Sequence, residues 1–384
     1  LLSLSVCDNG AHLPYGETGT GHYGANIVSI YDNYQILLRS EFFLDVAKTV
    51  PFPDRNSVYN IGDYGTADGA AAMKLLKKLI ECLKEHHGPD VQFQVIHEDK
   101  VDNDFNSLFR RLGGLIPDPQ SYLQDLENVY ALASGTNFYK QCVPADSMHI
   151  ILCIAGIHWL SGKPPVNKDF IYSFPGTEAV VRQRLEKLAS EDWERFLIFR
   201  SRELKKGGLM IVAAPSDNAN RSGGVQICSE SFLQTLNSTW KEFRDKGRIS
   251  KIEFINTNLA CLQKSLDMLK SPFEDPNSKV VMSGLRLLSA ELVTIPCGAC
   301  DDWLRQKENK GVDDRAGYAR RYVAANRCWS NSAFLTGLSE SRSREEKEEI
   351  VNELYDQVEE GIRNMNPETL KNDKQFAYLY ITKK

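Results

Sequence analysis

The chain has 384 residues, 42% of them hydrophobic, and a formal net charge of −5. The length predicts one large domain or two coupled ones. The net charge leaves no basic face of the kind that a nucleic-acid partner needs. No apolar run approaches the roughly 18 residues of a membrane span. Nine scattered cysteines and no recognisable signal peptide favour a cytoplasmic protein with reduced thiols.

The first predicted element is a helix. Apolar residues from Ile27 onward predict that it runs to about residue 50, where Pro51 and Pro53 would end it.

A strand, a glycine-rich turn and a second helix follow. Residues 58–61 are β-prone, Asp63, Gly65 and Gly69 come next, and a helical apolar pattern begins after Gly69. Glycines let a ligand approach the backbone, and a helix N-terminus favours a polar or anionic group. The spacing is neither Gly-x-Gly-x-x-Gly nor a Walker loop. It resembles the first motif of S-adenosylmethionine-dependent methyltransferases, although an ordinary strand-to-helix turn would look similar.

A second strand is predicted at 91–96, and Asp99 lies just past its end. In doubly wound sheets an acidic residue at this point commonly binds ribose, because a carboxylate can accept two hydrogen bonds from a cis-diol. The alternative is an acidic turn residue.

A third apolar strand is predicted at 148–157, followed by His158 and Trp159. Such folds bind ligands at the carboxyl ends of their strands. Taken alone, His158 is better explained as a hydrogen-bonded core histidine. Residues 134–139, which come earlier, are predicted to form a loop.

The remaining pattern is mostly helical and predicts an α/β core interrupted by helical insertions. Such insertions can roof a pocket at the ends of the strands. Helices are expected at 193–204, 232–243, 259–269, 316–338 and 345–365, and strands at 207–215, 280–295 and 376–382.

Several of these segments together resemble the SABATH family of small-molecule methyltransferases, the salicylic acid, benzoic acid and theobromine type. The resemblance rests on Gly65-Thr-Ala-Asp-Gly69, the run from Asp99 to Phe109, Asn137-Phe-Tyr139, His158-Trp-Leu-Ser161, and Tyr23 with Asn26. It implies an α/β fold, with a Rossmann-like methyltransferase core, a mixed seven-stranded sheet and a helical cap, often in a homodimer. The expected division is core at 1–215, 279–296 and 344–384, and helical cap at 216–278 and 297–343.

The resemblance also implies the site. Cofactor-binding positions for S-adenosylmethionine would be Tyr23, Asp63, Gly65, Gly69, Asp99, Lys100, Asn137 and Phe138. Substrate-binding positions would be Tyr23, Ile30, Ala155, His158 and Trp159, of which His158 and Trp159 would hydrogen-bond the carboxylate of a small acid. A partial match to a metal site falls on Asn167, Glu253 and Asn256, although the chemistry does not require Mg²⁺.

Departures from the plant members bear on the substrate. Ile27 and Ile30 stand where those have Ser and a substrate-facing Gln, Ala155 replaces a Tyr, and Lys100 replaces a Leu. We therefore expect a divergent, non-plant member that forms the methyl ester of a lipophilic acid of fatty or isoprenoid type. The alternatives are N-methylation of a small heterocycle and a ligand-binding protein without turnover.

Overall fold

The computed structural model describes residues 12–52, 54, 57–162, 168–172, 179–216, 229–371 and 373–384. Within these residues seven strands form one sheet in the order β3-β2-β1-β4-β5-β7-β6. The strands are β1 (Val58–Tyr64), β2 (Gln92–Lys100), β3 (Val129–Thr136), β4 (Met148–Ile154), β5 (Leu204–Pro215), β6 (Leu285–Ile295) and β7 (Lys374–Lys383). The first five run parallel, while β7 is antiparallel to β5 and β6. The expected mixed seven-stranded sheet is confirmed.

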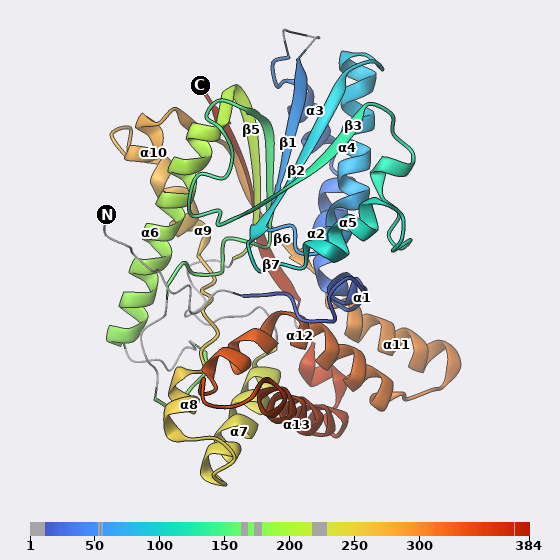
Figure 1. Ribbon diagram of the computed structural model, residues 1–384, viewed down its shortest axis with the longest axis vertical. Coiled ribbons are helices and arrows are strands. Elements are labelled where there is room, and N and C mark those ends of the chain that lie inside the picture. The colour runs from blue at the N-terminus through green and yellow to red at the C-terminus, as the bar shows by residue number, and fades with distance from the viewer. Residues whose placement is uncertain are drawn as a thin grey trace.

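Helices cover both faces of the sheet and gather at one of its ends (Figure 1). The helices are α1 (His22–Asn26), α2 (Val28–Leu38), α3 (Glu41–Lys48), α4 (Met73–His87), α5 (Phe105–Leu112), α6 (Ala179–Glu203), α7 (Glu230–Asp245), α8 (Lys251–Asn256), α9 (Leu266–Lys270), α10 (Lys279–Met282), α11 (Gly298–Lys310), α12 (Arg315–Gly337) and α13 (Arg344–Arg363). Short 3₁₀ turns lie at Ala70–Ala72, Tyr122–Gln124, Ser271–Phe273 and Pro367–Leu370. None of the helices described is long and apolar enough to cross a bilayer.

Two apolar layers enclose the sheet. Successive strand side chains point to opposite faces, so Ile150 and Leu152 pack with α2, α3, α4 and α5, whereas Ile151 and Cys153 pack with α6, α9 and α10. The fully buried β4 reads as a continuous apolar run for this reason.

A third cluster forms the cap, where α7, α8, α11, α12 and α13 lie together beyond one end of the sheet (Figure 1). Trp240, Trp303, Phe334 and Leu354 are among its buried residues. The expected division of the chain placed residues 344–384 in the core, whereas α13 packs within this cluster. Residues 344–363 pack on α7 and α12, because the apolar stripe of α13 faces those helices and not the sheet.

The edge strand β3 was not predicted, since residues 134–136 were assigned to a loop. Its side chains alternate between partly buried and exposed, and Ala131, Ala133 and Gly135 contribute little apolar surface. This half-exposed edge strand therefore lacks the apolar run that identified β4.

Several helix and strand predictions had wrong boundaries, among them the helix expected at 193–204, which begins at Ala179 as α6. The helix expected at 27–50 is split, because Ser40 accepts a hydrogen bond from the backbone N–H of Phe43 and starts α3. Much of 259–269 is extended around Cys261, which forms an isolated β-bridge with Trp159. The strand expected from residue 280 begins at Leu285, after the short α10.

Candidate active site

A cavity of about 900 Å³, partly open to solvent, lies at the carboxyl ends of the parallel strands. The chain leaves β1 toward β2 on one side and returns through β4 on the other, so the cavity sits at the topological switch point of the sheet. Six of the eight residues predicted to bind the cofactor line it: Tyr23, Gly65, Asp99, Lys100, Asn137 and Phe138.

The glycine-rich turn forms one wall of this cavity. Gly65 has φ +79°, and a Cβ there would meet only the Cα of Gly156 at 3.8 Å, so its backbone conformation, more than crowding, favours glycine. At Gly69 a Cβ would lie 2.5 Å from Cδ1 of Leu108. Gly69 therefore allows α5 to approach the turn, and it does not line the cavity.

Asp99 connects this turn to the end of β2. Its Oδ2 accepts a 2.7 Å hydrogen bond from the backbone N–H of Ala67, and its Oδ1 accepts one of 2.7 Å from its neighbour Lys100. Burial raises the pKa of Asp99 to about 6, against the lowering effect of these donors. A carboxylate oxygen has two lone pairs, so Asp99 can hold the turn and still accept from a diol.

Asp63 lies beneath the turn and outside the cavity wall, contrary to the prediction of direct contact. It is fully buried, and its Oδ2 accepts from the hydroxyl of Thr66 at 2.6 Å and lies 3.1 Å from Nδ1 of His97. The other ring nitrogen of His97 lies 3.0 Å from the Tyr122 hydroxyl. This polar chain supports the turn from inside the core.

Asp68 also lines the larger cavity, and sequence reasoning did not single it out. Its Oδ2 accepts from the backbone N–H of Gly24 at 2.9 Å and from Nη2 of Arg111 at 3.1 Å. It thereby fixes α1, and with it Tyr23, against the turn. Its position inside the motif was the available signal.

A second cavity of about 470 Å³ adjoins the first. It contains all five predicted substrate residues, and its lining is Tyr23, Ile27, Ile30, Ala155, His158, Trp159, Pro215, Trp329, Lys374 and Phe376. Five of these residues also line the first cavity, namely Tyr23, Ile27, Ile30, Ala155 and Trp159. The two spaces therefore meet at the side chains that follow β4.

The loop after β4 that carries His158 and Trp159 is held from several directions. Leu262 donates its backbone N–H to the carbonyl of His158 at 2.9 Å, and the backbone N–H of Ser161 donates to the buried Asp192 at 2.8 Å. The Tyr139 hydroxyl donates to the carbonyl of Trp159. The two side chains are therefore presented by a fixed backbone.

His158 is neutral in this environment. Burial lowers its pKa to about 3, and the positive charges of Lys264 and Lys374 contribute in the same direction, as does His12. Its Nδ1 is buried and has no hydrogen-bond partner within the described residues. A neutral imidazole with a free ring nitrogen can donate to a ligand without carrying charge.

Comparison with known proteins identifies the family. A family model described as "SAM dependent carboxyl methyltransferase" matches residues 29–382. The chain belongs to this family. It is 22% identical over 285 residues to gibberellic acid methyltransferase 1 of Arabidopsis thaliana, covering 69% of this chain and 73% of that protein. It is 31% identical over 171 residues to a probable 7-methylxanthine methyltransferase 2 of Theobroma cacao, covering 40% and only 44%.

A solved structure of loganic acid methyltransferase with SAH shares the fold of this carboxyl methyltransferase. The TM-score is 0.70 at 19% identity, with 97% of this chain and 98% of the other covered. The expected Rossmann-like core and the dependence on S-adenosylmethionine are thus confirmed.

His12 is a further residue of this methyltransferase's site that the sequence did not reveal. Its ring stacks on Trp159 with centroids 4.5 Å apart, and its Nδ1 lies 2.8 Å from the carbonyl oxygen of Trp329 in α12. Burial lowers its pKa to about 4. His12 thus joins the loop after β4 to the cap, and no local motif marks it.

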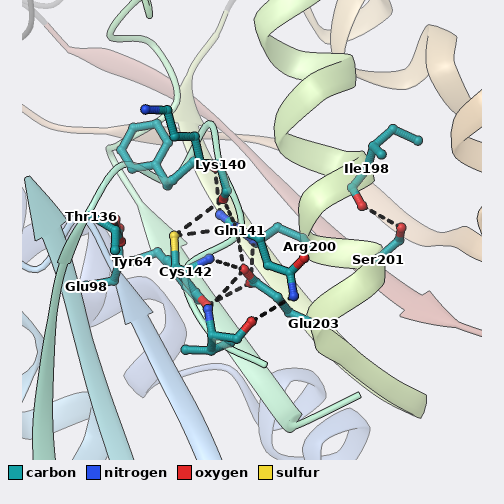
Figure 2. A network of polar contacts seen from close by, with 12 residues as sticks. Tyr64, Glu98, Thr136, Lys140, Gln141, Cys142, Ile198, Arg200, Ser201 and Glu203 are labelled. Carbon is teal, nitrogen blue, oxygen red and sulfur yellow. Dashed lines mark hydrogen bonds and ion pairs between the residues drawn. The ribbon is translucent and has the colours of Figure 1, made fainter. Parts of the chain in front are cut away.

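A polar network supports the loop after β3 that carries Asn137 and Phe138 (Figure 2). Arg200 donates to the carbonyls of Phe138 at 2.7 Å and Lys140 at 2.6 Å, and it pairs with the buried Glu203. Nearby, Glu98 accepts from the hydroxyl of Thr136 at 2.9 Å. Burial raises the pKa of Glu98 to about 8.

The residues described do not fit the predicted metal site. Arg342 contacts both oxygens of Glu253, and the backbone N–H groups of Ser250 and Ser339 also donate to them. These donors, Arg342 first, lower the pKa of Glu253 to about 2. Asn256 is exposed, and Asn167 lies outside the described residues. No cluster of His, Cys, Asp and Glu suited to a metal occurs in the described part of the chain.

Proposed function

We propose that this protein transfers the methyl group of S-adenosylmethionine to the carboxylate of a small lipophilic acid of fatty or isoprenoid type. The observation that carries the proposal is the meeting of two cavities at Trp159, one with the residues expected for the cofactor and one with apolar walls around His158.

The cofactor would lie in the first cavity. Asp99 would accept from the ribose hydroxyls, and Phe138, whose carbonyl Arg200 holds, would pack near the adenine. When bound, S-adenosylmethionine supplies a methyl group on a cationic sulfur, and the sulfur keeps the electron pair of the broken C–S bond.

The residues of the second cavity would orient the acid. A carboxylate is ionised at neutral pH, so one oxygen can form the new bond without a general base. Nδ1 of His158 and the indole N–H of Trp159 would hold the carboxylate in line with the methyl group. The apolar walls exclude water from this step.

The lining of the second cavity supports an apolar acid. Ile27, Ile30, Trp329 and Phe376 offer hydrocarbon surface, and Ala155 leaves space between them. Each buried methylene contributes about 0.8 kcal/mol. A third cavity of about 1000 Å³ shares Trp329 and Lys374 with it and gives room for a longer acid. Among the relatives, one is named farnesoic acid carboxyl-O-methyltransferase, from Arabidopsis thaliana, with 26% identity over 238 residues.

Incubation with methyl-labelled cofactor and a panel of free acids tests the proposal. The panel would include decanoic, farnesoic, loganic, benzoic and salicylic acids. We expect transfer to an aliphatic or isoprenoid acid, with label that mild base releases, because esters hydrolyse and N-methyl groups do not. Cofactor binding without transfer to any acid would contradict the proposed function.

We further propose a cytoplasmic protein, as the scattered cysteines favour, that forms a homodimer, as the family resemblance implies. Light scattering of the purified protein would measure the assembly.

A further inference from the structure

A buried lysine lies behind the carboxylate site, although it lines none of the cavities described above. Lys264 is 1% exposed, and its Nζ donates a 2.6 Å hydrogen bond to the carbonyl of Ile157, the residue before His158. Its own carbonyl accepts from the hydroxyl of Ser216 at 2.8 Å, which fixes its backbone. Lys264 thus contacts the loop that presents His158.

The charge of Lys264 is not paired in the described part of the chain. The nearby carboxylate of Asp192, on α6, accepts instead from the backbone and hydroxyl of Ser161 and from Arg195. An ammonium group buried without a counter-charge costs free energy. A ligand anion held at His158 would offset this cost.

The substrate carries the matching charge. A carboxylate that leaves water for an apolar cavity also needs a counter-charge, and His158, being neutral, supplies a hydrogen bond but no charge. The methyl ester formed from that carboxylate is uncharged, so the product would lack the coulombic attraction to Lys264 that favours binding of the acid.

We propose that Lys264 is a positioning residue that provides the positive charge behind the substrate carboxylate. This inference rests on the proposed function, because it concerns the same carboxylate. It predicts discrimination between the acid and any neutral analogue of the same shape.

The titration of Lys264 offers a test that needs no variant. Burial lowers its pKa to about 8, while Asp192 and the thiols of Cys261 and Cys153 raise it. The other titratable groups around the carboxylate site are His158, His12 and Lys374. The pKa values of the two histidines are lowered to about 3 and about 4, so neither histidine changes its charge near pH 8. Preference for an anion should therefore weaken as pH rises through about 8.

The experiment compares decanoate with decanamide, which differ in charge but little in shape, by calorimetry on the protein saturated with SAH. In the wild type we expect decanoate to bind at least about tenfold more tightly, because opposite charges attract strongly where water is largely excluded. Lys264→Gln can keep the hydrogen bond to Ile157 but lacks the charge. It should lose the preference for decanoate and retain its affinity for decanamide.

Lys264→Arg is the matched control, since it keeps the charge and does not titrate below about pH 12. It should retain the preference at about pH 9.5, where the preference of the wild type is weakened. A wild type that binds both probes equally, or a folded Lys264→Gln variant that keeps the preference, would overturn the inference. If no acid is methylated while decanoate is still preferred, the proposed function fails and the charge assignment stands.

Discussion

The hydroxyl of Tyr139 donates a 2.5 Å hydrogen bond to the carbonyl oxygen of Trp159. Tyr139 directly follows Asn137 and Phe138 in the wall of the larger cavity, and Trp159 stands where the two cavities meet. One hydrogen bond therefore joins the loop after β3, on the cofactor side, to the loop after β4, on the substrate side. A disturbance here should affect both ligands.

Tyr139→Phe removes this hydrogen bond and the longer one, 3.4 Å, from the same hydroxyl to the carbonyl of Ile157. We expect kcat/KM for the acid to fall about tenfold, with a loss of about 1 kcal/mol in the free energy of unfolding, the usual contribution of one buried hydrogen bond. Steady-state kinetics and denaturant melts measure the two effects. Tyr130→Phe, at a tyrosine that is 52% exposed on β3, is the control. Unchanged kinetics in a destabilised Tyr139→Phe variant would show that the connection is only structural.

Asp99→Ala should weaken binding of S-adenosylmethionine by roughly 1.5 to 3 kcal/mol, because a charged acceptor is lost. The structure adds a second reason, since Asp99 also accepts from Ala67 in the glycine-rich turn. Calorimetry measures the affinity, and the exposed Asp102→Ala provides a control on the same segment. Equal affinities for wild type and Asp99→Ala would refute the ribose assignment.

The sequence identified residues of the site that follow predicted strands, because their position in a parallel sheet fixes which edge they occupy. Asp99 and His158 were located in this way. The direction of a side chain within a tight turn is less predictable, so Asp63 was expected in the cavity and lies beneath it. His12 and Lys264 were missed because tertiary packing brings them in from segments without a local motif.

The fold, like the site, was predictable where the local sequence pattern determines it and not where tertiary packing does. Buried β4 was predicted because all its residues except His149 are apolar, whereas the edge strand β3, with Ala131, Ala133 and Gly135, was not. The amphipathic pattern of α13 predicted a helix, but the pattern does not say which neighbour its apolar stripe meets. The stripe meets the cap.

Glu98 predicts a pH dependence of stability. Burial raises its pKa from the ordinary 4.5 to about 8. Between these values the unfolded chain loses a proton that the folded protein keeps, so stability falls as pH rises through this window and levels off above about 8. The glutamine of Glu98→Gln does not titrate. The free energy of unfolding of this variant relative to wild type should therefore increase from about pH 5 to 8, by at most about 1.4 kcal/mol per pH unit.

Denaturant melts of the protein without cofactor at several pH values would test this dependence. Glu127→Gln, at an exposed position, should give a constant difference from wild type over the same range. A constant difference for Glu98→Gln as well would mean that Glu98 is ionised in the folded protein.

Ala155 controls the space between the two cavities, and it offers the sharpest test of the substrate class. It lines both cavities, its N–H donates to the carbonyl of Ala213 at 2.7 Å, and its φ is +57°. The backbone is therefore fixed, and any larger side chain must fill the junction. Ala155→Tyr should lower kcat/KM for decanoate at least about tenfold, because several methylenes at about 0.8 kcal/mol each would lose their place, while benzoate is affected less.

Ala155→Gly is the matched control for this substitution. Glycine tolerates a positive φ without strain, so the variant should be as stable as wild type or more stable by up to about 1 kcal/mol. It leaves the junction open and should keep the wild-type order of acids. Competition kinetics with decanoate and benzoate measure that order for all three proteins. If Ala155→Tyr and Ala155→Gly rank the acids identically, the chain of the substrate does not pass Ala155, and the lipophilic acid assigned to this cavity is wrong.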